Sequence, residues 1–161
     1  MMCLAFKHNA TSFFGKLIKF YTRSEYCHCE LIFSDGQWFS SRELNNGVGF
    51  VTGPPSGEKL TDYDFYLLPI SKDDEARIRA WCEKEQWNDD GTRCGYDVRG
   101  VMFSFLPIPI GWQSADKWFC SEICCAALQT IGWFAGYSAA SISPKKLHEL
   151  TLKEVKKRCR K

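Results

Sequence analysis

The order of the expected strands and helices predicts an α+β fold in which helices pack on a small antiparallel sheet. Strand-like runs rich in aromatic and aliphatic residues lie between residues 26 and 70, and Asp35-Gly36 between two of them is typical of a hairpin turn. Two strong helical patterns follow them. The 161 residues, 45% apolar and 25% charged, fit one globular domain over 1–161, with a basic and solvated tail from about 153 to 161.

The first half of the chain is expected to hold one helix and up to four strands. The helix follows Thr11-Ser12, which can cap it, and its apolar residues then fall at helical spacing. The first strand runs over 26–33, and Ser34-Asp35-Gly36 turns the chain into a returning strand over 37–41. Further strands are expected over 47–51 and 64–70, separated by the Gly53–Gly57 break.

The second half is expected to be mainly helical. A helix begins at Ser71, with Asp74 in a capping-box-like position, and stops around 88–91. Residues 92–117 are expected to form no regular helix or strand. A second helix runs from Cys120 to Gly132, and a short last helix begins at Ser143-Pro144 and continues through Leu150.

Charge and hydropathy exclude several classes of protein. The 21 Lys and Arg against 19 Asp and Glu give a net charge of +2, which leaves no general nucleic-acid footprint. Lys7 and His8 interrupt the N-terminal segment where a signal peptide needs an apolar run. The longest apolar run, 101–112, contains Pro107 and Pro109 and is shorter than the ~20 residues of a spanning helix. We therefore expect a soluble, cytoplasmic protein with no transmembrane segment.

The nine cysteines are many for this length, and their number is odd. Without a secretion signal they are interpreted as reduced thiols. The chain contains no Cys-x-x-Cys pair, and in Cys27-His28-Cys29 the histidine on a strand points away from both neighbouring thiols. Neither a metal site nor a cofactor is therefore predicted.

The strongest chemical feature is Trp118-Phe119-Cys120-Ser121-Glu122, which puts Cys120 at the beginning of a predicted helix. The positive end of the helix favours a thiolate, the nucleophilic form of cysteine. His28, held on a strand, is the best-placed base among the three histidines. The alternative is that both are ordinary core residues, as Cys82, Cys124 and Cys125 are expected to be.

Several segments in order resemble one family. These are Leu17–Thr22, Tyr26–Gly36 with its Cys-His-Cys-Glu run, Tyr96-Asp97, Trp118–Glu122 and Ser143-Pro144. Together they are similar to the circularly permuted branch of the NlpC-type papain-like superfamily, which includes the YiiX-like cysteine hydrolases. In that branch the histidine strand precedes the cysteine helix. The resemblance covers about residues 17–150.

The resemblance implies a papain-like fold with Cys120 as nucleophile and His28, on the first core strand, as general base and later acid. For the third residue, which orients the imidazole, it leaves Glu30 and Ser40 open. Glu30 shares a strand face with His28 and carries a charge, so it is favoured, although a surface charge on an edge strand is the alternative. Tyr96 is similar to a tyrosine that assists the oxyanion, together with the Cys120 backbone N–H. Ordinary loop packing is its alternative, and Glu122 is expected to be a helix cap.

The expected reaction is attack of a thiolate on an amide, thioester or ester carbonyl, followed by release of an acyl-enzyme. The substrate would be a peptide, an amide or an acyl lipid. Lipid acyltransferase or deacylase activity is the alternative, and the apolar segment 102–112 could form an acyl-binding wall or simply cover the core. A non-catalytic binding module and a thiol-based redox switch are two further alternatives.

Overall fold

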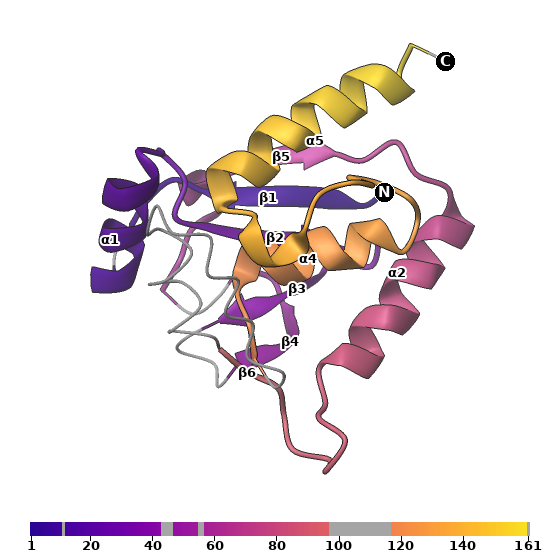
Figure 1. Cartoon of the computed structure of the whole chain (residues 1–161), viewed down its shortest axis with the longest axis horizontal. Helices are drawn as coiled ribbons and strands as arrows, with labels where there is room; N and C mark the ends of the chain where they lie inside the picture. Colours follow the sequence, from indigo (N-terminus) through magenta and orange to yellow (C-terminus); the bar gives the residue numbers. More distant parts are fainter. Residues whose placement is uncertain (11, 43–46, 55–56, 97–116, 161) are drawn as a thin grey trace.

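Five antiparallel strands form the centre of the protein, in the spatial order β4-β3-β2-β1-β5 (Figure 1). The computed structural model describes residues 1–10, 12–42, 47–54, 57–96 and 117–160. The strands are β1 (Cys3–Lys7), β2 (His28–Ile32), β3 (Gln37–Arg42), β4 (Gly47–Thr52) and β5 (Tyr63–Leu67). The predicted α+β class, with helices on a small antiparallel sheet, is confirmed.

Strand β1 lies between β2 and β5, although the sequence analysis predicts no strand at the N-terminus. β1 is an interior strand, and accordingly Leu4 and Phe6 are fully buried on one face of the sheet and Ala5 on the other. His28 pairs with Lys7, the last residue of β1. His28 therefore lies on the second strand of the chain, and the expectation that it lies on the first is wrong.

The predicted hairpin between β2 and β3 is confirmed. Leu31 pairs with Phe39 and Ile32 with Trp38, and the chain turns at Asp35-Gly36. Gly36 has a φ of 84°, which glycine adopts without strain. The turn closes with a bond of 2.8 Å from the Phe33 N–H to the Gln37 carbonyl.

One face of the sheet is covered by three helices, α2 (Lys72–Glu85), α4 (Cys120–Gln129) and α5 (Pro144–Arg158). Helix α4 crosses β2 and β3 between the other two (Figure 1). On the α2 side, the Arg79 guanidinium lies 4.3 Å from the centre of the Phe33 ring. On the α5 side, the His148 ring packs 5.2 Å from that of Phe6. Helix α1 (Phe13–Thr22) lies at the margin of the molecule (Figure 1).

Helix starts follow the predicted caps. The hydroxyls of Ser12, Ser71 and Ser143 each accept a bond from the backbone N–H three residues on. The core between sheet and helices contains fully buried side chains from both layers, among them Leu4, Phe6, Leu31, Phe39, Ile78, Ile123, Leu128 and Leu147.

Two predicted boundaries differ from the structure. Helix α5 extends to Arg158, so most of the predicted tail is helical, because Val155 continues the apolar stripe of Leu147 and Leu150 against the core. Residues 92–117 are predicted to be irregular, yet β6 (Gly95–Tyr96) and β7 (Lys117–Trp118) pair in parallel. Two short 3₁₀ helices, η1 (Leu60–Asp62) and η2 (Ala139–Ser141), complete the described elements.

The opposite face of the sheet has a different composition. A small apolar cluster of Ala5, Trp38 and Tyr63 lies there, beside buried charged side chains from β2 and β3. Of the helices in the described part of the chain, none is long and apolar enough to cross a membrane.

Candidate functional site

Cys120 is the first residue of α4 and is fully buried. The chain before it is held in place because the Ser41 hydroxyl of β3 donates a bond of 2.7 Å to the Trp118 carbonyl. The Phe119 N–H donates to the Glu122 carboxylate at 3.3 Å, so Glu122 caps the helix as the sequence predicts. The sulfur thus lies at the helix end where backbone N–H groups favour negative charge.

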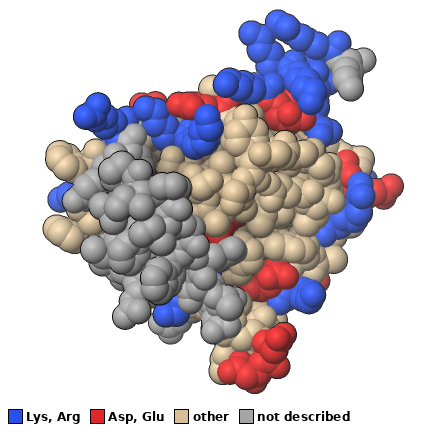
Figure 2. Space-filling model, in the orientation of Figure 1, with Lys and Arg blue, Asp and Glu red and all other residues tan. Residues whose placement is uncertain are grey.

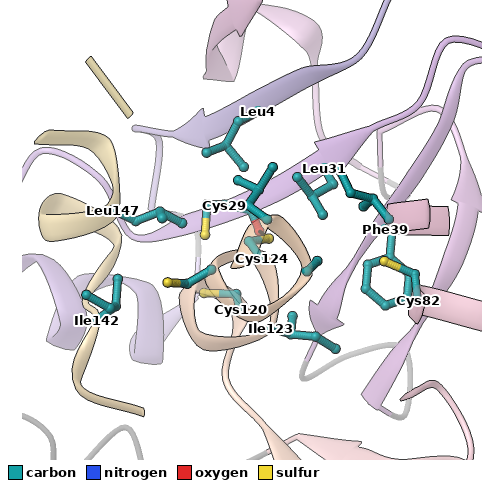
Figure 3. Close-up of a cluster of buried hydrophobic side chains, with 14 of the residues drawn as sticks. Leu4, Cys29, Leu31, Phe39, Cys82, Cys120, Ile123, Cys124, Ile142 and Leu147 are labelled. Carbon is teal, nitrogen blue, oxygen red and sulfur yellow. Dashed lines mark hydrogen bonds between the residues drawn. The ribbon is translucent and has the colours of Figure 1, made fainter. Parts of the chain in front are cut away.

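Strand β2 meets the beginning of α4 close to the point where the pairing between β2 and β3 ends. The paired residues of that ladder are Leu31 and Ile32, so the start of β2 has backbone groups available for other partners. The Cys29 carbonyl accepts a bond of 2.8 Å from the Ser40 hydroxyl. Figure 3 shows Cys29 on β2 facing Cys120 and Cys124 on α4.

Cys120 and His28 shift each other's ionisation in opposite directions. Burial alone would raise the pKa of Cys120, but hydrogen bonds from the Cys29 thiol and backbone, together with the charge of His28, lower it to about 5. Burial alone would lower the pKa of His28, but the facing Cys120 and the Glu30 carboxylate raise it to about 10. Near neutral pH the two side chains therefore form a thiolate–imidazolium pair.

Glu30 provides the second anionic partner of His28. Its Oε1 lies 3.3 Å from His28 Nε2, and its carboxylate also pairs with the Arg42 guanidinium. Glu30 is fully buried on an interior strand, so the alternative of a surface charge on an edge strand is wrong. Burial would raise the pKa of Glu30, but the bond to His28 and the Arg42 charge lower it, so the carboxylate is ionised.

A chain of polar contacts continues from Glu30 toward the surface. The Tyr63 hydroxyl lies 3.2 Å from Glu30 Oε1 and also contacts the Glu58 carboxylate. Lys7 Nζ completes the chain at 2.5 Å from Glu58 Oε1. Because a phenol has one proton to donate, Tyr63 can serve only one of the two carboxylates at a time. The network supplies Arg42 as the cation that balances the buried Glu30 and Lys7 as the cation that balances the half-buried Glu58.

The remaining predicted residues occupy different positions. Ser40 is buried, and its hydroxyl is directed to the Cys29 carbonyl rather than to the imidazole. The Tyr96 ring lies 6.2 Å from the ring of Phe119, the neighbour of Cys120. Asp97 and the apolar segment 102–112 lie outside the described residues.

Sequence reasoning missed Cys29, Arg42 and Tyr63. Arg42 carried a usable signal, because the hairpin register and strand alternation put it on the same sheet face as Glu30. Tyr63 reaches Glu30 only through the pairing of β1 with both β2 and β5, which local sequence does not reveal.

Four other buried cysteines have pKa values shifted in the direction opposite to that of Cys120. Burial raises the pKa of Cys27 to about 11 and that of Cys125 to about 12, and it also raises the pKa values of Cys29 and Cys82. All nine cysteines lie within the described residues, and none of them is joined in a disulfide bond. The predicted core role of Cys82, Cys124 and Cys125 agrees with their complete burial.

Two properties of the described residues bear on what the protein can bind. No group of three or more His, Cys, Asp or Glu side chains within the described ranges could hold a metal ion. A pocket of about 320 Å³ lies between residues 23–26 and the first turns of α5, where His148 forms part of its wall. Its lining does not include Cys120, His28 or Glu30.

Comparison with known proteins adds no relative: no protein-family model, curated protein or solved structure matches the chain. The resemblance to the permuted NlpC-type superfamily therefore depends on the motifs quoted above.

Proposed function

We propose that the protein is a cysteine hydrolase with Cys120 as nucleophile, His28 as general acid and base, and Glu30 as the residue that orients His28. The observation that carries the proposal is the pair of opposed shifts, which lower the pKa of Cys120 to about 5 and raise that of His28 to about 10. Such a pair provides a nucleophile and a proton donor at the same pH. The order of motifs and the helix-bound cysteine support a permuted papain-like fold.

The reaction follows from these groups. The Cys120 thiolate attacks the carbonyl carbon of an amide, thioester or ester, and the imidazolium of His28 then gives its proton to the leaving group. Neutral His28 next takes a proton from water, the resulting hydroxide attacks the acyl-enzyme, and the acid product leaves as the thiolate is restored. The Cys120 N–H is one candidate donor to the oxyanion, and Tyr96 is the proposed second.

The contact of Glu30 with Nε2 leaves Nδ1 as the ring nitrogen that serves Cys120. A carboxylate on Nε2 both orients the ring and stabilises its protonated form. Ser40 has a different proposed role. Its bond to the Cys29 carbonyl supports the strand that donates to the Cys120 sulfur.

Alternative activities use the same nucleophile. Transfer of the acyl group to an acceptor other than water would make the protein an acyltransferase, and no contact among the described residues favours that acceptor over water. A redox switch has one supporting observation, the hydrogen bond between the thiols of Cys29 and Cys120. A non-catalytic module would not need a cysteine with a lowered pKa.

The proposal is tested by titrating and labelling the thiols. The ultraviolet absorbance of thiolate, measured as the difference between the wild type and Cys120→Ala, should show a step near pH 5. Limiting iodoacetamide at about pH 6, followed by peptide mass mapping, should modify Cys120 first, because it is the ionised thiol. Cys125→Ala is the matched control, and it should leave both the step and the labelling unchanged. A Cys120 step above about pH 8, or labelling spread evenly over several cysteines, would contradict the proposal.

A further inference from the structure

We propose that Tyr63 is a positioning residue for the proposed hydrolase and that it acts on His28 through Glu30. Its hydroxyl is shared between Glu30 and Glu58, so Glu58 influences how strongly the Glu30 carboxylate binds the imidazole. The inference rests on the proposed function of the His28–Cys120 pair and adds to it two residues of the neighbouring polar network. The evidence consists of the contacts of the Glu30 carboxylate and the packing of the Tyr63 ring.

The two oxygens of the Glu30 carboxylate have different partners. Oε1 lies 3.3 Å from His28 Nε2 and 3.2 Å from the Tyr63 hydroxyl, whereas Oε2 accepts from the guanidinium of Arg42. The same guanidinium donates from its other Nη to the Gly49 carbonyl of β4 at 3.1 Å, which ties Oε2 to the backbone of the sheet. Rotation of the carboxylate would break these contacts together. Oε1 is therefore held at the point where the imidazole and the phenol meet.

Strand register explains how a residue of β5 reaches an acid of β2 across β1. Tyr63 and His28 both pair with Lys7 of β1. Glu30 pairs with Ala5, two residues earlier in β1, so all of these side chains share one face of the sheet. Because the side chain of Ala5 is only a methyl group, the Tyr63 ring can extend over β1 toward Glu30.

The small apolar cluster on this face holds the Tyr63 ring in that position. The rings of Trp38 and Tyr63 meet edge-on, with 5.2 Å between their centres, and both side chains are 4% exposed. A buried edge-on contact of this kind restricts the plane of the phenol ring. The hydroxyl is therefore kept beside Oε1 of Glu30 by packing as well as by hydrogen bonding.

The buried charges of the described strands are also concentrated on this face. Lys7, Glu30 and Arg42 are buried, and register and alternation place all three on the face turned away from α2, α4 and α5. Figure 2 shows the helix-covered side, where uncharged side chains occupy the middle and charged ones gather at the margins, with basic side chains over the end of α5. Glu30 therefore receives its counter-charge and its hydrogen bonds from neighbouring strands, and Tyr63 is one of the groups that supply them.

The Tyr63 hydroxyl is one donor with two acceptors. Burial and the carboxylates of Glu30 and Glu58 raise the pKa of Tyr63 above its ordinary range, so the phenol keeps its proton. Glu58 also contacts the hydroxyl and is itself paired with Lys7 Nζ at 2.5 Å. When the proton is directed to Glu30, Oε1 binds the His28 imidazolium less strongly, because its charge is shared between two donors. When the proton is directed to Glu58, Oε1 serves the imidazolium alone.

The test is an NMR titration of the His28 ring in the full-length protein. Tyr63→Phe keeps the aromatic ring and removes the donor, so the midpoint of the His28 titration should rise by about 0.5–1 pH unit. Glu58→Gln directs the phenol proton to Glu30 and removes a negative charge, so the midpoint should fall by about the same amount. Cys120 and Glu30, which both face His28, are unchanged in the two variants.

Hydrolysis of p-nitrophenyl acetate at pH 7 provides the second measurement. In Tyr63→Phe, kcat should fall about threefold to tenfold and KM should stay as in the wild type, because the orientation of Glu30 changes and substrate contacts do not. Tyr66→Phe is the matched control. It removes a phenol from the same strand, where the hydroxyl contacts His148 Nε2 at 2.8 Å, and it should change neither kcat nor the His28 midpoint.

The double variant Tyr63→Phe/Glu58→Gln separates a route through the phenol from a direct effect of the Glu58 charge. The change in the His28 midpoint caused by Glu58→Gln should be less than about half as large when Tyr63 is absent. An undiminished change would show that Glu58 acts on His28 directly, which would overturn its proposed role through Tyr63.

Two further results would overturn the proposal. The first is a Tyr63→Phe protein that keeps the thermal unfolding profile of the wild type together with its His28 midpoint and its kcat. The second is an unchanged midpoint in Glu58→Gln, which decides the question if Tyr63→Phe does not fold. The His28 midpoint is measured without turnover, and labelling of Cys120 uses the wild-type chain. Failure of this inference and failure of the proposed hydrolase activity are therefore seen in different experiments.

Discussion

His28 and His148 are both half-buried, yet their surroundings shift their pKa values in opposite directions. His28 on β2 lies between Cys120 and Glu30, and these partners overcome burial and raise its pKa to about 10. His148 on α5 packs against the rings of Phe6, Tyr26 and Tyr66, with its Nε2 2.8 Å from the Tyr66 hydroxyl. There burial is the main influence, and it lowers the pKa of His148.

The comparison shows that burial alone does not determine the charge of a histidine. Removal from water disfavours the imidazolium in both places. Of the two sites, which both lie in the described part of the chain, the His28 site supplies anions at hydrogen-bonding distance of the imidazole, and one of them, Glu30, is in turn paired with Arg42. Around His148 the charges of Glu25, Asp64 and Glu149 also raise the pKa, but they do not outweigh the effect of burial. Substituting one residue in the surroundings of each histidine, or the histidine itself, therefore tests the comparison.

The largest effect is expected from Glu30→Gln. The substitution keeps the shape and a hydrogen bond, but it removes the charge that stabilises the His28 imidazolium, so the pKa of His28 should fall. Hydrolysis of a small activated ester such as p-nitrophenyl acetate should slow by about 10² to 10⁴. The pH profile should change as well, because Cys120 loses a protonated partner and its ionisation moves to higher pH.

Ser40→Ala is the control for this prediction. Ser40 bonds to the Cys29 carbonyl and not to the imidazole, so the ester rate should fall by less than about tenfold. A severe Ser40→Ala and a mild Glu30→Gln would transfer the orienting role to Ser40. If both are mild, Cys120 and His28 act as a dyad.

The second prediction concerns stability and uses Arg42→Ala. This change leaves the fully buried Glu30 without its guanidinium partner and also removes the bond of 3.1 Å from Arg42 to the Gly49 carbonyl. We expect the free energy of unfolding in urea to fall by about 3–5 kcal/mol. In the double variant Arg42→Ala/Glu30→Gln, the free energy of unfolding should fall by less than the sum of the two single losses. The reason is that no unpaired carboxylate is then left buried at position 30.

Arg77→Ala provides the comparison for an exposed ion pair. Arg77 pairs with Asp74 on the surface of α2, and its removal should cost less than about 1 kcal/mol. Equal costs for Arg42→Ala and Arg77→Ala would show that the buried network contributes no more than a surface pair.

The smallest effect is expected for His148→Gln, measured as the pH dependence of stability. Because the folded pKa of His148 is lowered below the ordinary value of 6.5, the unfolded chain takes up its proton first as the pH falls. His148 therefore reduces stability below about pH 6.5, by under about 1 kcal/mol since the ring is partly exposed.

Glutamine can keep the bond to Tyr66 and does not titrate, so the urea stability of the variant should fall less between pH 7.5 and 5.5. His28 has the opposite sign. Its contribution is complete below pH 6.5 and is lost as the pH rises through about 10. A steeper loss of stability toward acid in the His148→Gln variant would contradict the assignment.

Local sequence predicted the features that neighbouring residues alone determine. Ser12, Ser71 and Ser143 mark helix starts because a hydroxyl can accept from an N–H three residues on. Asp35-Gly36 marks the hairpin because glycine accepts a positive φ. Cys120 at a helix start, and Glu30 on the strand face of His28, follow from spacing in the same way.

The tertiary structure decided what depends on residues distant in the chain. The short β1 carries too few alternating residues to be identified locally, yet its pairing with β2 and β5 brings Tyr63 to Glu30 and Lys7 to Glu58. The interior position of β2 likewise made Glu30 a buried ion. A charged side chain in a sequence is expected to be solvated, and only the arrangement of strands can provide the counter-charges that make its burial stable.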